Sequence, residues 1–222
     1  MLARDPAKML VPEGSGGVLA NSPLSDPNLK VVQGDVTNQD HVDELFKQTD
    51  DLCGVVVALG GRTKDVGPTL LTDGTKCILN GMKKQPAAKR IALITSIGVG
   101  DSEKKAPFTF KALMYTVMRK SFADKNNQEK LFTAASGPGH NLEYCIVRPG
   151  GLGNGPATGV VNVSEGEGGS IHRADLAGFM LRAISEPTFP YLRKTPCVSS
   201  VHGTGWKKQP EIKGFDNIKS AE

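Results

Sequence analysis

The sequence lacks any long hydrophobic run. No apolar stretch approaches the roughly 18 residues that a membrane-spanning helix needs. The N-terminus also lacks the charged, apolar and small-residue regions of a secretory signal peptide. We therefore expect no membrane partner and no secretion. The expected compartment is the cytoplasm, or an organelle if a targeting segment precedes Met1.

Residues at metal-ligand spacing are missing too. The four cysteines, Cys53, Cys77, Cys145 and Cys197, share no C-x-x-C spacing, and the four histidines form no ligand pattern. We therefore expect no metal site. Three of the cysteines lie in or beside apolar segments, where a cysteine behaves as a small hydrophobic residue. The thiols are predicted to be reduced and buried, as in a reducing compartment.

A strong charge of either sign is absent. The formal net charge is +4, the isoelectric point is about 8.8, and the lysines are scattered along the chain. This balance is too weak to indicate nucleic-acid binding, but it tolerates a small ligand that carries phosphate. The expected partner is a small-molecule substrate.

Glycine and proline are plentiful, and short β-branched runs alternate with helical patterns between the turns. The predicted strands are 29–36, 53–61, 90–96, 143–150 and 196–199, and the predicted helices are 38–48, 68–83, 122–135 and 171–184. This alternation predicts a Rossmann-like α/β fold, a parallel sheet with flanking helices and right-handed crossovers. Residues 1–199 form the predicted domain, and 200–222 a polar, poorly ordered tail.

Three local patterns sharpen this prediction. Asn38 is the expected N-cap of the first helix. The run at 53–61 has no polar alternation, which indicates a strand covered on both faces. In helix 68–83, five side chains at helical spacing are expected to face inward: Leu71, Thr75, Ile78, Leu79 and Met82. No structure is assigned to 106–120.

Small and polar residues gather where the predicted strands end, at 34–36, 59–61, 95–96 and 149–151. In an open α/β sheet, ligands bind beyond the carboxyl ends of the strands. Glycine there lets a ligand approach the backbone, while Ser and Thr supply hydroxyl groups. Each cluster alone is also explained by turn geometry. Four in succession indicate a common ligand crevice.

Several runs of this sequence resemble one family. They are GDVTNQD, VVVALGGR, ITSIGVGDS, FADKNNQEKLF, YCIVRPGGLGNGPATG and SIHRADLAGFMLRAI. Together they are similar to the NAD(P)H-binding atypical short-chain dehydrogenases/reductases, which include flavin reductase/biliverdin-IXβ reductase and NmrA-like proteins. The resemblance covers about residues 1–185. It implies a nicotinamide dinucleotide cofactor.

The resemblance places the adenosine end of the cofactor at the start of the chain. Arg4 would pair with a 2′-phosphate and so favour NADPH over NADH, a task that suits guanidinium geometry; the alternative is a surface arginine. Asp35 would hydrogen-bond near the adenine and Val36 would contact it. The alternative for Asp35 is a turn aspartate that caps its own backbone.

The resemblance implies similar roles at the other strand ends. Leu59, Gly60 and Gly61 would pass close to the phosphates and ribose, or else form a plain turn. Pro149, Gly150 and Gly151 would line the nicotinamide face, with backbone groups that reach the carboxamide. Asp175 is interpreted as a charge near a helix N-terminus rather than a catalytic group.

Three further residues carry the implied chemistry. Thr95 and Ser96 hold the position of the superfamily's catalytic hydroxyl, and Lys125 matches the lysine that contacts the nicotinamide ribose; a solvated helix lysine is its alternative. The usual catalytic pair is Y-x-x-x-K, but the residue four before Lys125 is Ser121, and Tyr115 does not fit the spacing. Catalysis by a tyrosine acid is therefore not supported.

The glycine-rich turn that seats a pyrophosphate is not found in this sequence. A dinucleotide fold begins with a strand, a glycine-rich turn and a helix, whereas the early cluster at 13–17 follows no predicted strand and opens no helix. Without that unit, the strands at 29–33 and 54–59 are expected to have unpaired apolar edges. We predict that residues 1–222 alone bind NADPH weakly or not at all; a micromolar dissociation constant from a fluorescence titration would contradict this.

Three functions are weighed. The first is an NADPH-dependent reductase of a small conjugated acceptor, such as a flavin or quinone, in which the cofactor performs the chemistry and the protein orients it. The second is a non-catalytic dinucleotide-sensing or scaffold protein of the NmrA-like type. The third, a sugar- or isoprenoid-modifying reductase, ranks last because such enzymes normally keep Y-x-x-x-K.

Overall fold

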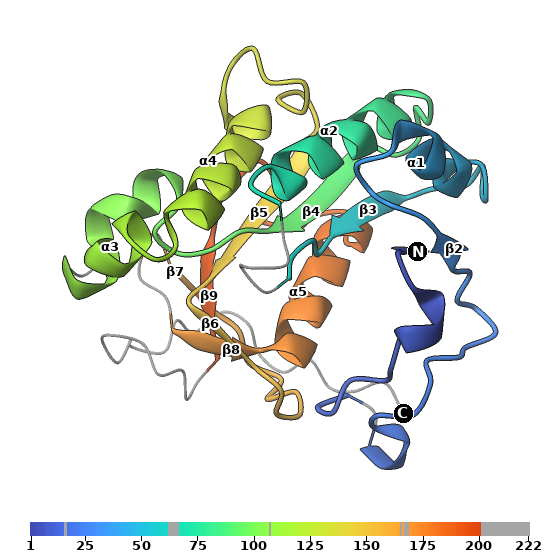
Figure 1. The fold of residues 1–222 in the computed structure, drawn as a ribbon, viewed down its shortest axis with the longest axis horizontal. Helices are drawn as coiled ribbons and strands as arrows, with labels where there is room; N and C mark the ends of the chain where they lie inside the picture. Colours follow the sequence, from blue (N-terminus) through green and yellow to red (C-terminus); the bar gives the residue numbers. More distant parts are fainter. Residues whose placement is uncertain (16, 62–66, 107, 165, 167–168, 201–222) are drawn as a thin grey trace.

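The computed structural model describes residues 1–200, apart from Gly16, residues 62–66, Pro107 and residues 165, 167 and 168. A five-stranded sheet lies at its centre (Figure 1). Its strands, in spatial order, are β3 (Gly54–Val57), β4 (Arg90–Ile94), β5 (Glu143–Pro149), β9 (Cys197–Ser199) and β7 (Asn162–Ser164). All neighbours pair in parallel except β7 and β9. The predicted Rossmann-like class is therefore confirmed. The predicted tail lies outside the described residues beyond Ser200.

Two small parallel sheets flank the central one. The first joins β1 (Leu2–Ala3) to β2 (Val32–Gln33), and the second joins β6 (Gly151–Gly153) to β8 (Ser170–His172). The strand predicted at 29–36 is thus much shorter than expected. No sequence pattern predicted β6, β7 and β8, because strands of three residues are too short to show a hydrophobic alternation.

The described residues form five α-helices: α1 (Gln39–Phe46), α2 (Leu70–Lys83), α3 (Phe108–Tyr115), α4 (Arg119–Thr133) and α5 (Arg173–Ser185). Short 3-10 turns occupy 6–8, 17–19 and 100–105. All four predicted helices are present, and α3 fills the segment without an assignment. Asn38 caps α1 as expected, since its side chain accepts hydrogen bonds from the amides of Asp40 and His41. None of the described helices is long and apolar enough to cross a bilayer.

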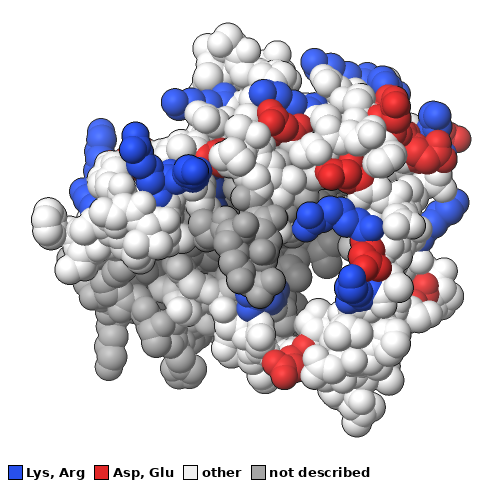
Figure 2. All heavy atoms as spheres, in the orientation of Figure 1, with Lys and Arg blue, Asp and Glu red and all other residues white. Residues whose placement is uncertain are grey.

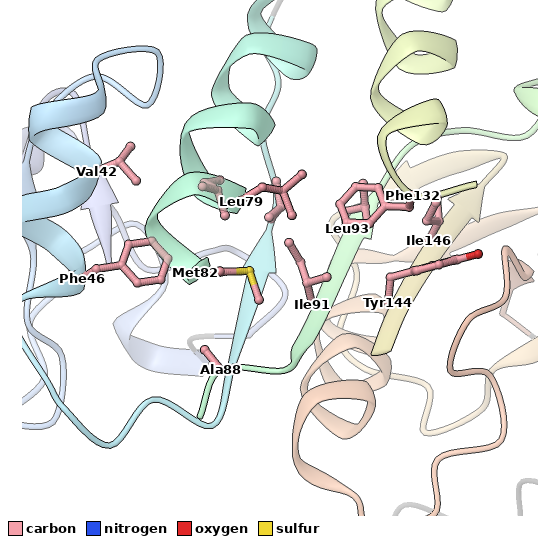
Figure 3. Packing of buried hydrophobic residues seen from close by; sticks show 12 residues of the cluster. Val42, Phe46, Leu79, Met82, Ala88, Ile91, Leu93, Phe132, Tyr144 and Ile146 are labelled. Carbon is pink, nitrogen blue, oxygen red and sulfur yellow. The ribbon is translucent and has the colours of Figure 1, made fainter. Parts of the chain in front are cut away.

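Side chains of the central strands alternate between two cores. On one face Ile91, Leu93 and Ile146 pack against α1, α2 and Phe132 of α4 (Figure 3). On the other face Ala92, Cys145 and Val147 pack against α5. The five side chains of α2 that were predicted to face inward are all buried. Burial on both faces explains the continuous apolar runs of β4 and β5.

The prediction of a strand covered on both faces is wrong for part of β3. Val57 is buried, but Val56 on the opposite face is 40% exposed. Among the described residues β3 pairs only with β4, and β2 pairs only with β1. β3 is therefore an edge strand, and its second face is only partly covered by α5, which approaches Gly54 through Ile184.

The four cysteines are free thiols. Cys145 and Cys197 are buried as predicted, but Cys77 is half-buried and Cys53 is exposed, so the prediction of burial is wrong for Cys53. Cys53 precedes the first residue of β3, where the chain has not yet entered the sheet. Burial raises the pKa of Cys145 to about 12, so this thiol stays protonated at neutral pH.

Charges are distributed unevenly over the face shown in Figure 2. Basic and acidic side chains alternate over α1, α2 and the N-terminal segment, whereas mainly Lys and Arg appear over α3 and the beginning of α4. Although the lysines are scattered along the sequence, positive charge is in local excess on the surface over α3 and the beginning of α4.

Candidate functional site

The carboxyl ends of β2 and β3 meet above α2. A Cβ atom at Gly74 of α2 would lie 2.8 Å from Cγ1 of Val36 and 3.0 Å from Cδ1 of Leu59. Both side chains therefore rest on the same glycine, and a larger residue there would push them apart. Gly60 is exposed, and no other atom lies within 4 Å of where its Cβ would be. The structure thus brings the clusters at 34–36 and 59–61 together beside open space.

Asp35 forms a turn with Thr37. Its Oδ1 accepts hydrogen bonds from the amide of Thr37 at 2.9 Å and from the hydroxyl of Thr37 at 2.8 Å. These bonds lower the pKa of Asp35, and the positive charge of the exposed Arg4 lowers it further. The turn role named as the alternative is therefore present. The turn uses only Oδ1 of Asp35, and the Arg4 side chain is near enough for its charge to act on this carboxylate.

Lys125 is fixed at the end of β4. It lies on α4, and its Nζ donates a hydrogen bond of 2.9 Å to the carbonyl oxygen of Thr95. The ammonium also lies 5.8 Å from the ring centre of Phe122. Burial lowers the pKa of Lys125, while the nearby Glu129 carboxylate counteracts this effect. Lys125 is therefore half-buried and bonded, not a solvated helix lysine.

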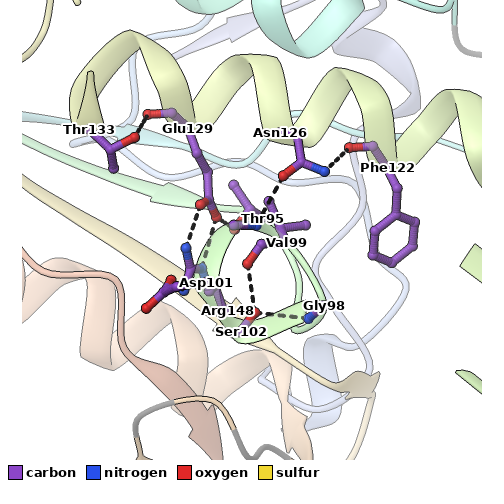
Figure 4. A network of polar contacts seen from close by, with 11 residues as sticks. Thr95, Gly98, Val99, Asp101, Ser102, Phe122, Asn126, Glu129, Thr133 and Arg148 are labelled. Carbon is purple, nitrogen blue, oxygen red and sulfur yellow. Dashed lines mark hydrogen bonds and ion pairs between the residues drawn. The ribbon is translucent and has the colours of Figure 1, made fainter. Parts of the chain in front are cut away.

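A buried ionic network lies behind this lysine (Figure 4). Arg148 donates to both carboxylate oxygens of Glu129, at 2.9 and 2.5 Å, and to Asp101 at 2.5 Å. The hydroxyl of Thr95 donates to Glu129 at 2.6 Å. Sequence reasoning missed Arg148 and Glu129. A signal existed, since Glu129 follows Lys125 by four residues and so shares its helix face.

The network fixes the turn that follows β4. The side chain of Ser102 accepts a hydrogen bond from the amide of Gly98 and donates one to the carbonyl of Val99. Gly98 has a φ of 85° and Gly100 a φ of 58°, a region that favours glycine. Ser96, which is partly exposed, is thereby held at the start of a rigid turn.

The ends of β4 and β5 lie side by side. The amide of Thr95 donates to the carbonyl of Val147 at 2.9 Å, and the amide of Ile97 donates to that of Pro149 at 3.1 Å. The amide of Gly150 donates to the carbonyl of Gly169. The clusters at 95–96 and 149–151 are thus adjacent. Because β3, β4 and β5 are parallel, the clusters at 59–61, 95–96 and 149–151 lie along one edge of the central sheet. The cluster at 34–36 joins them through the approach of Val36 and Leu59 to Gly74.

A loop at 152–159 follows this edge and is held by the first residues of α5. Asp175 accepts hydrogen bonds from the amides of Thr158 and Gly159 at 2.8 and 3.0 Å, and from the hydroxyl of Thr158 at 2.9 Å. His172 bonds to the carbonyl of Pro156 through Nδ1 at 2.7 Å. Asp175 therefore lies in the first turn as predicted, and it anchors this loop.

The three tyrosines have other partners. The hydroxyl of Tyr115 donates to Glu103. Tyr144 is the second residue of β5, at the opposite end of the sheet from Lys125, and packs against Phe132. Tyr191 packs against Phe179 and Phe189. The residue one helical turn before Lys125 is Ser121. None of these contacts involves Lys125.

The described residues fit the two ends of a nicotinamide dinucleotide. Arg4 and Asp35 lie at one end of the edge, Lys125 and Ser96 at the other, and the open space at Gly60 lies between them. Within the described ranges, no glycine-rich turn joins a strand to a helix N-terminus as a pyrophosphate seat. In the same ranges, no group of three His, Cys, Asp or Glu could hold a metal ion.

The chain is similar to known proteins over most of its length. A family model described as NAD(P)H-binding matches residues 19–187. Among solved structures, ChuY, an anaerobilin reductase from Escherichia coli O157:H7, has a TM-score of 0.60 and 22% identity over 78% of this chain and 76% of that chain. The oxidoreductase ylbE from Lactococcus lactis has a TM-score of 0.63 and 21% identity over 80% of this chain and 74% of that chain.

A third structure is that of a Bacillus halodurans protein named as a candidate NAD-dependent epimerase/dehydratase. Its TM-score is 0.56, with 25% identity over 77% of this chain and 72% of that chain. The family match spans well over half of the chain, and the solved structures share its fold. The cofactor of this fold is a nicotinamide dinucleotide. The chain belongs to the NAD(P)H-binding family and has the Rossmann-like fold of the atypical short-chain dehydrogenases/reductases.

Proposed function

We propose that the protein is an NADPH-dependent reductase that transfers a hydride to a small conjugated acceptor of the flavin or quinone type. The observation that carries the proposal is the site around Lys125. The site holds an ammonium group against the end of β4. The tyrosines of the chain contact other residues: Tyr115 bonds to Glu103, and Tyr144 and Tyr191 pack against phenylalanine rings. Such a site can position a hydride donor without supplying a strong acid. This suits an acceptor that takes its proton from water.

At the nicotinamide end, each residue has a distinct proposed task. The ammonium of Lys125 has three N–H donors; Thr95 takes one, and another reaches the ribose hydroxyls. The hydroxyl of Thr95 is engaged by Glu129, so Ser96 is the hydroxyl that meets the acceptor. Pro149, Gly150 and Gly151 line the nicotinamide ring and leave room for it, since they have little side-chain bulk. When bound, the dihydronicotinamide supplies the hydride.

At the adenosine end, the proposed contacts come from the first loops of the chain. Arg4 binds the 2′-phosphate, and Asp35, through the oxygen that Thr37 does not use, hydrogen-bonds near the adenine. Val36 and Leu59 provide the apolar surface on which the base lies, since both rest on Gly74. Gly60 and Gly61 leave room for the ribose and phosphates.

The proposal is tested by following NADPH oxidation by the full-length polypeptide with a panel of free flavins and quinones. Turnover with at least one acceptor is expected, with a rate that depends on enzyme concentration. The variant Lys130→Met, which alters an exposed lysine on the same helix, serves as a matched control and should keep the wild-type rate. An absence of turnover across the panel would count against a reductase.

A dinucleotide-sensing protein is the second candidate. It is favoured by the internal bonding of groups that would otherwise face a substrate: the hydroxyl of Thr95, the carbonyl of Pro149 and the amide of Gly150 all have partners within the protein. This candidate predicts capture of a protein partner that depends on the dinucleotide and consumes no NADPH. A pull-down with and without NADPH distinguishes the two functions.

Arg4→Ala is expected to reduce the preference for NADPH. A charge-assisted hydrogen bond to a phosphate contributes about 1.5–3 kcal/mol, which corresponds to about a 10- to 150-fold change in affinity. Kd or kcat/KM for NADPH should worsen by about this factor, while the values for NADH should stay unchanged. Equal losses with both cofactors, or no loss with either, would show that Arg4 does not bind the 2′-phosphate.

A further inference from the structure

We propose that α3 and the residues around it form a peripheral binding surface for anionic lipid membranes. We call this surface the α3 patch. It consists of the exposed apolar residues Phe108, Leu113, Tyr115 and Val117 and of the basic side chains Lys104, Lys111, Arg119 and Lys120 around them. The inference goes beyond the proposed reductase function and does not depend on it.

Large apolar side chains are concentrated at the α3 patch. Phe108 is 85% exposed, Val117 75%, Tyr115 58% and Leu113 42%. They are four of the eleven large hydrophobic residues that are exposed among the described residues, and they fall within ten positions of the chain. Single exposed apolar residues need no explanation, whereas a cluster of this kind marks a site of interaction.

The helix that carries these residues is firmly attached to the body of the protein. Met114 is buried and, with Val99 and Phe122, forms a small core of its own. A Cβ atom at Gly98 would lie 2.7 Å from the sulfur of Met114, so α3 packs directly on the turn after β4. One side of α3 is thereby buried. Phe108 and Tyr115, which are two helical turns apart, share another side, which is exposed.

The charge of this region is positive. Residues 100–120 contain five basic residues and two acidic ones, a net charge of +3 in a chain whose total is +4. Both acidic groups are engaged, because Asp101 accepts a hydrogen bond from Arg148 and Glu103 accepts one from Tyr115. Figure 2 shows the same excess of Lys and Arg over α3 and the start of α4.

This combination matches an anionic bilayer more closely than a protein or a nucleic acid. Exposed aromatic and aliphatic groups surrounded by lysine and arginine are typical of segments that lie in the membrane interface. The apolar groups enter the boundary of the acyl chains, and each basic residue near the surface contributes about 1 kcal/mol with anionic lipids. A nucleic acid could stack its bases on Phe108 and Tyr115, but it would leave the aliphatic side chains of Leu113 and Val117 uncovered.

The experiment is co-sedimentation of the full-length polypeptide with vesicles. Vesicles of phosphatidylcholine with phosphatidylglycerol should bind the protein, and vesicles of phosphatidylcholine alone should bind it much more weakly. Binding should weaken as salt is added, because screening reduces the attraction. A chain that does not sediment with the anionic vesicles overturns the proposal.

Three double variants make the test specific. Phe108→Ser with Val117→Ser, and Lys104→Ser with Lys120→Ser, should each lower binding at least tenfold. For the lysine variant, a loss of about 1 kcal/mol, or about fivefold in affinity, for each lysine gives more than a tenfold loss for the pair. Val18→Ser with Leu19→Ser alters exposed apolar residues elsewhere and should bind like the wild type. If all three variants bind equally, the α3 patch is not the membrane surface. Thermal unfolding of each variant confirms that it is folded.

Discussion

Replacing Arg148 with methionine is expected to lower the free energy of unfolding by about 3–5 kcal/mol. The side chains of Arg148 and Glu129 are each only 3% exposed. Burial alone would lower the pKa of Arg148, but the hydrogen bonds and charges of Glu129 and Asp101 raise it, so the guanidinium stays charged. Without it, the buried Glu129 carboxylate loses its bidentate partner and keeps only the more distant charge of Lys125. Urea denaturation measures the loss.

Two further variants separate this effect from a general loss of charge. Lys76→Met breaks an exposed ion pair with Asp73 and should change the stability by less than about 1 kcal/mol. Arg148→Met combined with Glu129→Leu should regain part of the loss, since the buried carboxylate is removed together with its partner. A single variant as stable as the wild type would mean that Glu129 is not held by Arg148 in solution.

Lys125→Met is expected to lower kcat/KM for NADPH oxidation about 100-fold. If the ammonium bonds the nicotinamide ribose, the variant loses a charge-assisted hydrogen bond of about 1.5–3 kcal/mol. The methionine side chain fills the same space beside Phe122, so the melting temperature should change little. Lys130→Met is the control on the same helix. A loss of less than threefold, or an equal loss in the control, would remove Lys125 from the site.

The pH dependence gives a second measurement of the same group. Burial lowers the pKa of Lys125 in the folded chain, so the active ammonium form is lost as the pH rises through that lowered value. The wild-type rate should therefore fall on the alkaline side earlier than a free lysine would allow, and the Lys125→Met rate should not show this step. The stability of the fold changes in the opposite direction to the rate as the pH rises. The unfolded chain binds the proton more tightly, so this group favours the folded state more at alkaline pH than at neutral pH.

The fold was largely predictable because it rests on long periodic segments. β4 and β5 have continuous apolar runs that both faces of the sheet bury, and α2 has inward residues at helical spacing. The same signal failed for β3, whose second face is partly exposed at Val56. It could not identify β6 to β8, because such short strands depend on pairing with distant segments, which no local pattern encodes.

The candidate site was predictable as a set of loops, but not in its supporting contacts. The ends of β3, β4 and β5 lie along one edge, as their parallel order requires, and Val36 after β2 lies beside Leu59 at Gly74. The sequence did not reveal that Thr95 gives its hydroxyl to Glu129, or that Arg148 holds Glu129. Many acidic residues of the chain could pair with Arg148 in β5, and only the packing of α4 against β5 selects Glu129.

The attachment of the loop at 152–159 makes this region open to redesign. His172, Arg173 and Asp175 hold it mainly through its backbone, at the carbonyls of Leu152 and Pro156 and at the amides of Thr158 and Gly159. A carbonyl or an amide is retained whatever side chain the residue carries. Leu152 and Ala157, both exposed, can therefore be varied in a library while the loop keeps its path, so new acceptors can be selected without rebuilding the scaffold.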